Sequence, residues 1–212
     1  MFLTLRSEVR DRFKVLEKHF KHSPVTPPDV SKTSKGLVFV EIYAVYEYTV
    51  RQATQTAIQV IASHNHPFNK LRPSLAAVFL HPQLEALRMC KNDNVWRKRL
   101  ELMNKADSID TIAAVNVVPH DGSHFRYSQV QIIFETLGIN LPFVRHPRQA
   151  WLIDEVVRHR NAIAHGEESP QQIGANFTSA DVLSRIQDMR EVCLKIITLM
   201  SKHCSVPRRH RR

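Results

Sequence analysis

Apolar residues recur at helical spacing along much of the chain. Across about residues 4–22 they lie three and four positions apart, which predicts a helix with one buried stripe. The residues of this stripe are Leu5, Val9, Phe13, Leu16 and Phe20. A second helix is predicted from Ser34 to about Ser63, and its first half is apolar nearly all round. A helix that is apolar on every side belongs at the centre of a bundle.

Prolines interrupt the helical pattern between and beyond these two helices. Pro24, Pro27 and Pro28 predict an extended connector between the first helix and the second. Further prolines break residues 64–127 into short pieces, apart from a helix predicted over about residues 93–105. The later apolar patterns predict helices over residues 128–137, 147–165 and 178–202.

Capping residues support the boundaries of the last three helices. Gly138 and Gly166 suit helix C-termini, and Pro147 suits a first helical position. Thr178 to Asp181 resembles a capping box in which Asp replaces the usual Glu or Gln. We therefore expect an all-α helical bundle around the long second helix. One domain is expected over residues 1–206, with residues 64–127 as an irregular insertion of short helices and residues 207–212 as a basic, disordered tail.

The charge balance favours a polyanionic partner. Thirty Lys and Arg against twenty Asp and Glu give a formal net charge of +10, and +6 remains without the four arginines of residues 207–212. Basic side chains displace counterions from phosphate backbones and so favour nucleic acid. The three cysteines show no CxxC spacing, and no segment approaches the roughly 18 apolar residues of a membrane span. We expect a soluble, cytoplasmic protein without a membrane segment.

The chemistry concentrates at the end of the helix predicted over residues 147–165. A helical projection places Arg160 inside an apolar sector, where an unpaired charge would cost several kcal/mol or more. Arg160 therefore needs an internal acid, a route to solvent, or a surface that a second molecule covers. Arg158, Asn161 and His165 share a neighbouring face with the right chemistry to hold a phosphate. A histidine in the last turn of a helix can transfer a proton near neutral pH.

The string Arg160-Asn161-Ala162-Ile163-Ala164-His165 has an arginine, a polar residue, three further residues and a histidine. It resembles the HEPN superfamily (higher eukaryotes and prokaryotes nucleotide-binding), whose ribonuclease members carry an Arg-x4-6-His motif. The wider context, residues 151–166 and the helical segment 40–50, is similar to the MAE_28990/MAE_18760-like or RiboL-PSP HEPN branch. The resemblance covers most of the chain.

This resemblance implies a metal-independent endoribonuclease that needs no cofactor. His165 would act as general acid or base, Arg160 would bind the scissile phosphate, and Asn161 would orient one of them. The products would be a 2′,3′-cyclic phosphate and a 5′-hydroxyl. RNA would be cut in a cleft of a homodimer, each protomer supplying its arginine and histidine, with Arg158 as a further RNA contact. Many relatives are toxins or effectors of toxin–antitoxin or anti-phage systems, so an antitoxin or other partner protein is also implied.

Other interpretations stay open. Arg160 can instead pair with the internal acid Glu47, which is more simply a structural partner of the motif than a catalytic group. The chain can be a catalytically silent HEPN module that binds RNA or a partner protein, or a nonspecific DNA binder. Some HEPN toxins carry a tyrosine after the motif histidine at which an antitoxin silences them, but here Gly166-Glu167-Glu168 follows. That mode of regulation is therefore not indicated.

Histidine pairs raise a metal hypothesis that the spacing alone does not support. The pairs are His64 with His66, His19 with His22, and His120 with His124. Each has a conceivable ligand spacing, but none comes with a set of cysteine or carboxylate ligands. We therefore expect no functional metal site. Phe125, Arg126 and Tyr127 can stack on bases, although ordinary packing between loop and helix is the simpler interpretation.

Overall fold

The computed structural model describes residues 1–21, 27–120 and 124–211, and in this part it is helical without a β-strand. The α-helices are α1 (Phe2–Lys21), α2 (Pro28–Ala62), α3 (Pro73–Phe79), α4 (His81–Met89), α5 (Val95–Ala106), α6 (Tyr127–Thr136), α7 (Pro147–Ala164), α8 (Pro170–Ala175) and α9 (Ser179–Cys204). Three short 3-10 helices are η1 (Phe68–Lys70), η2 (Asn92–Asn94) and η3 (Pro207–His210). The expected all-α fold is confirmed.

The capping residues act as predicted. Gly138 and Gly166 have φ angles of 76° and 71°, the left-handed conformation that ends helices α6 and α7. Thr178 Oγ1 accepts from the Asp181 backbone N–H at 3.1 Å, and the Asp181 carboxylate accepts from the Thr178 N–H at 2.9 Å. This reciprocal pair is a capping box, and aspartate therefore serves in place of glutamate.

Helix α2 begins earlier than the sequence pattern predicts. It starts at Pro28 rather than near Ser34, so Pro28 is helical and not part of an extended connector. Proline suits the first turn of a helix, because the backbone N–H that it lacks has no helical partner there. Pro24 and His22 lie outside the described residues, so the His19–His22 pairing cannot be placed.

The chain divides into two compact units. The first comprises Met1–Ala53, Gly122–Val130 and Pro142–Thr198, and the second comprises Thr54–Asp121, Gln131–Leu141 and Leu199–Arg212. The irregular insertion expected over residues 64–127 falls largely in the second unit, where it forms α3, α4 and α5.

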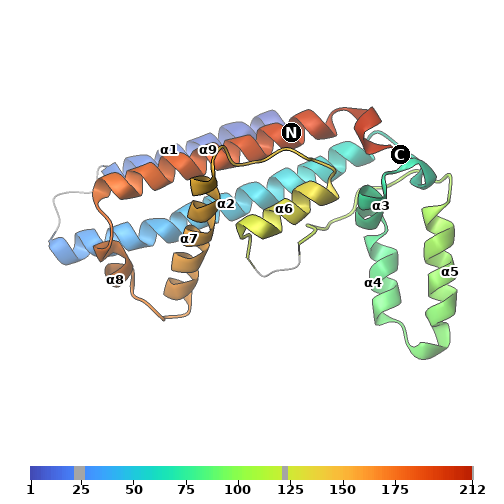
Figure 1. Ribbon diagram of the computed structural model, residues 1–212, viewed down its shortest axis with the longest axis horizontal. Helices are drawn as coiled ribbons and strands as arrows, with labels where there is room; N and C mark the ends of the chain where they lie inside the picture. Colours follow the sequence, from blue (N-terminus) through green and yellow to red (C-terminus); the bar gives the residue numbers. More distant parts are fainter. Residues whose placement is uncertain (22–26, 121–123, 212) are drawn as a thin grey trace. The chain divides into compact units, whose positions relative to one another are not determined.

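In the first unit, α1 and α9 lie along α2, and α7 runs across them (Figure 1). The predicted stripe of α1 faces the core, with Phe2 added and Phe20 half-buried. Arg6 of α1 donates a hydrogen bond to Thr198 of α9 at 3.1 Å. The guanidinium carbon of Arg12 lies 3.8 Å from the ring centroid of Tyr48 on α2. The apolar half of α2 supplies fully buried aromatic residues to this core: Phe39, Tyr43 and Tyr46.

Glycines set the distance between α2 and α8. A Cβ atom at Gly36 would lie 1.9 Å from the Pro170 carbonyl oxygen, and one at Gly174 would lie 1.8 Å from the Lys32 carbonyl oxygen. Only glycine permits backbones to approach so closely. Helix α8 directly follows the end of α7, so this contact fixes the chain just beyond His165.

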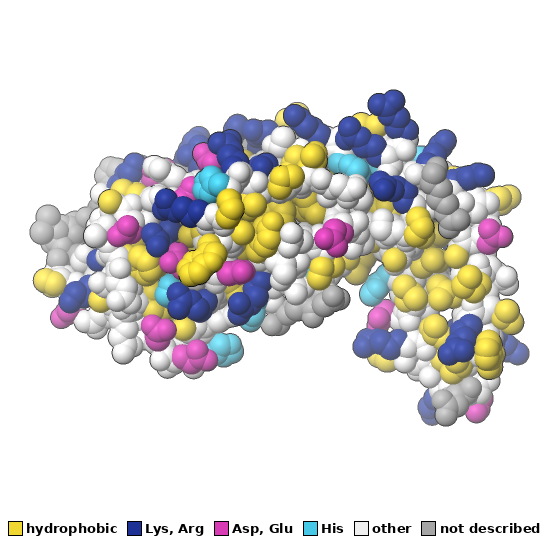
Figure 2. Space-filling view, in the orientation of Figure 1, with side chains coloured by type: hydrophobic (Ala, Val, Ile, Leu, Met, Phe, Trp, Pro, Cys, Tyr) yellow, Lys and Arg dark blue, Asp and Glu magenta, His cyan; other side chains and the backbone are white. Residues whose placement is uncertain are grey.

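The second unit contains a helical hairpin with little apolar burial. Helices α4 and α5 contact each other, and neither has a buried residue. Hydrophobic side chains gather on the surface of this part of the molecule (Figure 2). The exposed hydrophobic residues of the hairpin are Leu84, Met89, Trp96, Leu100 and Met103.

The C-terminal residues differ from the disordered tail that the sequence pattern indicates. Residues 207–210 form η3, and the side chain of His210 is fully buried. The His210 carbonyl accepts from the Arg72 N–H at 3.0 Å, and Leu71 pairs with Arg211 in an isolated β-bridge. Backbone pairing and the burial of one imidazole order this basic segment. Arg212 lies outside the described residues.

Candidate active site

Helix α7 brings the predicted motif to the surface of the first unit. Pro147 occupies the first turn, and the helix ends at Ala164 with His165 as its C-cap. The N–H of Glu167 donates to the Ala162 carbonyl at 2.9 Å, which closes the last turn around Gly166. The side chain of His165 is exposed.

The buried face of α7 differs in part from the helical projection. It consists of Gln149, Leu152, Ile153, Val156, Val157, His159 and Ala162. His159 replaces Arg160 in the interior, where its ring lies 4.9 Å from that of Phe39 and 5.6 Å from that of Phe177. Burial lowers the pKa of His159, so this imidazole is uncharged in the core. Ile163 is half-buried and Ala164 exposed, because the apolar contacts of α7 end at Ala162.

Arg160 is half-buried rather than enclosed. Its Nη1 donates to the Asn161 side-chain oxygen at 3.1 Å. Its guanidinium carbon lies 4.8 Å from the ring centroid of Tyr43, within the range of a cation–π contact. Among the described residues, no carboxylate lies within ion-pair distance of Arg160. The guanidinium is therefore oriented by Asn161 and Tyr43 while its charge remains available to an anion.

His124 lies near this motif, although the sequence pattern did not predict it. The pKa of His124 is lowered, mainly by burial and next by the charge of Arg160, with a smaller effect of His165. Its ring also lies 6.4 Å from that of Tyr43. Arg160 and His165 therefore both lie near one imidazole that is uncharged at neutral pH. Spacing to His120 was the only signal for His124 in the sequence, and it did not indicate this environment.

The loop that carries His124 is held in place by Phe125 and Tyr127. Phe125 is fully buried, which confirms the interpretation that it packs in the interior and does not stack on bases. Its ring centroid lies 5.0 Å from the guanidinium carbon of Arg51. The backbone N–H of Tyr127 donates to the Asp154 carboxylate of α7 at 3.0 Å. This bond caps the first turn of α6 and fixes the loop to the motif helix.

Glu47 and Arg158 do not pair with Arg160 but contact other residues. Glu47 accepts from Arg51, one turn further along α2, at 2.9 Å. Its carboxylate also raises the pKa of Tyr43, together with the larger effect of burial, so it lies near the ring that Arg160 covers. Arg158 is exposed, and its Nη2 lies 3.3 Å from Nε2 of His159. The structure thus brings Arg160 and His165 near His124, with Asn161 bonded to Arg160, and leaves Arg158 beside the buried His159.

This arrangement can bind an anion and transfer a proton. A half-exposed guanidinium binds phosphate oxygens, and an exposed imidazole can accept or donate a proton at neutral pH. Basic side chains are spread over the surface rather than confined to the tail (Figure 2). These features suit a charged, flexible polymer better than a small enclosed substrate.

Comparison with known proteins identifies the family of this chain. A family model described as HEPN_MAE_28990/-like HEPN matches residues 4–205. The chain belongs to this HEPN family. The match spans both compact units, so the α3–α5 segment is covered by the HEPN family model. Searches of curated proteins and of solved structures find no match for this HEPN chain. None of its described helices combines the length and apolarity needed to cross a bilayer.

Proposed function

We propose that this HEPN protein is a metal-independent endoribonuclease whose catalytic residues are Arg160 and His165, with Asn161 as a positioning residue. The proposal rests on the exposure and the contacts of the Arg160 side chain. Its guanidinium is half-exposed, oriented by Asn161 and Tyr43, and unneutralised by any carboxylate of the described residues. An arginine held in this way at the helix end that carries the exposed His165 is suited to a phosphodiester.

In the proposed reaction, an imidazole takes the proton of the ribose 2′-hydroxyl. The 2′-oxygen then attacks the phosphorus, and the bond from phosphorus to the 5′-oxygen breaks. A proton is delivered to the leaving 5′-oxygen, which gives a 2′,3′-cyclic phosphate and a 5′-hydroxyl without consumption of water. Arg160 stabilises the charge that develops on the phosphoryl oxygens. Asn161 acts as a positioning residue through its hydrogen bond with Arg160.

The two proton transfers support a composite site. One imidazole cannot be the base and the acid in the same step, and HEPN ribonucleases join the motifs of two protomers. We therefore infer a homodimer in which each copy contributes Arg160 and His165 to one cleft. Arg158, which is exposed, would contact RNA beyond the scissile phosphate.

The proposed cellular role is that of a toxin or effector in a toxin–antitoxin or anti-phage system, controlled by a partner protein. This role rests on HEPN family membership and on the proposed cleavage of RNA. Induced expression of the wild-type protein should arrest growth, whereas expression of His165→Ala should not. Equal growth arrest by both proteins would contradict a toxic ribonuclease activity.

The decisive experiment is incubation of the purified protein with RNA and with DNA of the same sequence in EDTA. We expect cleavage of RNA only, reduced by about a hundredfold or more in Arg160→Ala and in His165→Ala. His146→Ala and Arg148→Ala are matched controls, because both residues are exposed at the opposite end of α7.

Other outcomes identify the alternatives. RNA binding without cleavage would indicate the catalytically silent module. Equal binding of RNA and DNA without cleavage would indicate a nonspecific nucleic-acid binder. Cleavage that proceeds equally in the two motif variants would refute the assignment of Arg160 and His165.

A further inference from the structure

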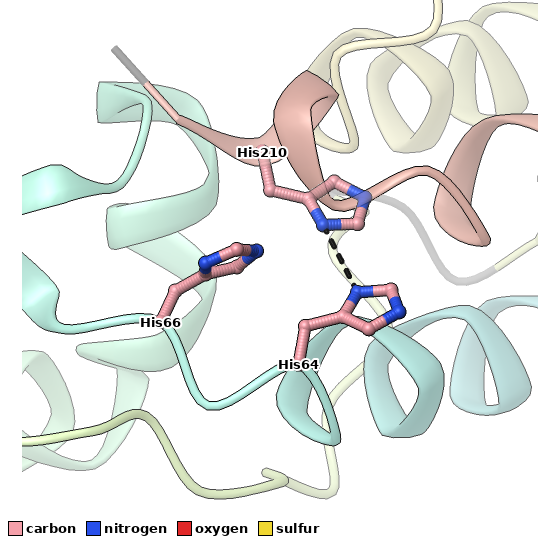
Figure 3. Close-up of side chains that lie close together, drawn as sticks. All are labelled: His64, His66 and His210. Carbon is pink, nitrogen blue, oxygen red and sulfur yellow. Dashed lines mark hydrogen bonds between the residues drawn. The ribbon is translucent and has the colours of Figure 1, made fainter.

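Three histidines from distant parts of the sequence meet in the second unit. His64 follows the end of α2, His66 precedes η1, and His210 closes η3. Their rings face one another (Figure 3). Asn65 lies between the first two and has a φ of 52°, in the left-handed region that asparagine tolerates better than most residues. This turn lets two histidines that are two positions apart direct their rings to the same place.

The separations of the ring nitrogens are close to those of a metal site. One nitrogen of each ring lies within 4.8 Å of one nitrogen of the other two. The Nδ1 atoms of His64 and His210 are 3.4 Å apart. Tetrahedral zinc with bonds of about 2.0–2.1 Å holds two ligand nitrogens about 3.3 Å apart. The pair from His64 and His210 therefore already has the required separation, and a small rotation of His66 would complete three ligands.

Burial favours the same interpretation. His66 is 1% exposed and His210 is fully buried, and Nε2 of His66 has no hydrogen-bond partner among the described residues. A buried nitrogen in this state is costly unless a ligand occupies it.

We propose that His64, His66 and His210 bind a divalent transition-metal ion of the zinc type, with a water molecule as the fourth ligand. The ion would join the loop after α2 to the C-terminal residues of the chain. Its role is structural, because all three ligands belong to the second unit, whereas Arg160 and His165 belong to the first. The proposal is independent of the ribonuclease activity.

Arg211 opposes this site in the metal-free protein. Its Nε donates to Nδ1 of His66 at 3.2 Å, so the proton of the neutral His66 ring lies on Nε2. Ligation through Nε2 moves that proton to Nδ1, which then needs an acceptor instead of a donor. Arg211 must therefore release His66 when metal binds. Arg211→Gln removes the opposing charge and offers a carbonyl oxygen to Nδ1–H.

The test uses the full chain without a polyhistidine tag, stripped with EDTA and desalted. Titration with Co²⁺ should produce visible d–d bands that saturate at one equivalent and disappear on addition of Zn²⁺. His64→Ala should weaken binding at least about tenfold, because loss of even an indirect partner of a ligand costs this much. His64 is half-exposed, so this variant should fold, and circular dichroism checks it. His146→Ala is the control with an exposed histidine of the first unit.

Two further readouts separate this site from adventitious binding. Zn²⁺ should raise the melting temperature of the wild type but not of His210→Gln, and Arg211→Gln should bind Co²⁺ more tightly than the wild type. Absence of saturable binding in the wild type, or equal binding by the wild type and His64→Ala, would overturn the site. Unchanged affinity in Arg211→Gln would refute ligation through Nε2 of His66.

The result is distinguishable from failure of the ribonuclease proposal. If EDTA lowers both RNA cleavage and the melting temperature, loss of the structural ion explains the lower activity. Cleavage by His64→Ala should then be the same with and without EDTA. RNA cleavage that persists in EDTA would support the proposed mechanism whether or not the metal site exists.

Discussion

Substitution of Gly174 tests how closely the segment after the motif must pack. In Gly174→Ala the new Cβ atom would lie 1.8 Å from the Lys32 carbonyl oxygen, and such contacts are essentially never shorter than 3.0 Å. The backbones of α2 and α8 must therefore separate by at least about 1.2 Å. The atom that blocks the methyl group belongs to the backbone of a long helix, so it cannot rotate away.

We expect Gly174→Ala to cost about 1–3 kcal/mol, the usual range for an overpacked core. In a chain of this size each kcal/mol lowers the melting temperature by about 2–4 °C. Gly166→Ala is the matched control, since its methyl group would meet no atom within 4 Å. Its cost arises only from the left-handed φ of 71° and should be about 1–2 kcal/mol.

Chemical denaturation monitored by circular dichroism measures both changes. A larger loss of stability in Gly174→Ala than in Gly166→Ala would support the argument from backbone contact. A Gly174→Ala protein as stable as the wild type would refute it, because it would mean that α8 does not approach α2 as closely as described. Because α8 follows His165, we also expect Gly174→Ala to cleave RNA less well at temperatures below its melting point.

Three further predictions concern Asp154, His124 and His210. Asp154→Ala should lower the free energy of unfolding by about 1–2 kcal/mol through loss of a helix cap, whereas Asp154→Asn, which keeps an acceptor oxygen, should lose less in urea denaturation. Arg160→Gln should raise the pKa of His124 measured by NMR titration, because a neighbouring cation is removed, and Arg158→Gln should leave it unchanged. Burial and the neighbouring histidines lower the pKa of His210 from 6.5 to about 4, so the unfolded chain is protonated first and stability should fall as the pH drops through this interval. His210→Gln should flatten that part of the stability curve, and an identical pH dependence in the variant would contradict the assignment.

The helical pattern predicted most of the elements because helices leave a local signature. The stripe of α1, the ends of α6 and α7, and the capping box of α9 depend on residues within one or two turns of each other. Short helices leave weaker signatures. Helix α8 has only six residues, and its capping box from Ser169 and Gln172 was not predicted.

The sequence by itself also determined the identity of the motif residues. Arg160, Asn161 and His165 lie within six positions at the end of one helix, so their placement at this helix end follows from the sequence alone. The periodicity did not determine how deeply α7 is buried. His159 rather than Arg160 lies in the core, where it packs against Phe39 and Phe177. These two residues come from other parts of the chain, so no local pattern in α7 indicates the contact.

Only the tertiary structure brought together residues that are far apart along the chain. His124 lies near Arg160 because Phe125 is buried and the Tyr127 N–H donates a hydrogen bond to Asp154. His210 reaches His64 and His66 across more than 140 residues through backbone contacts of the last turn. Such proximities depend on the packing of whole helices, and packing is decided by the sum of many weak contacts rather than by the spacing of any one motif.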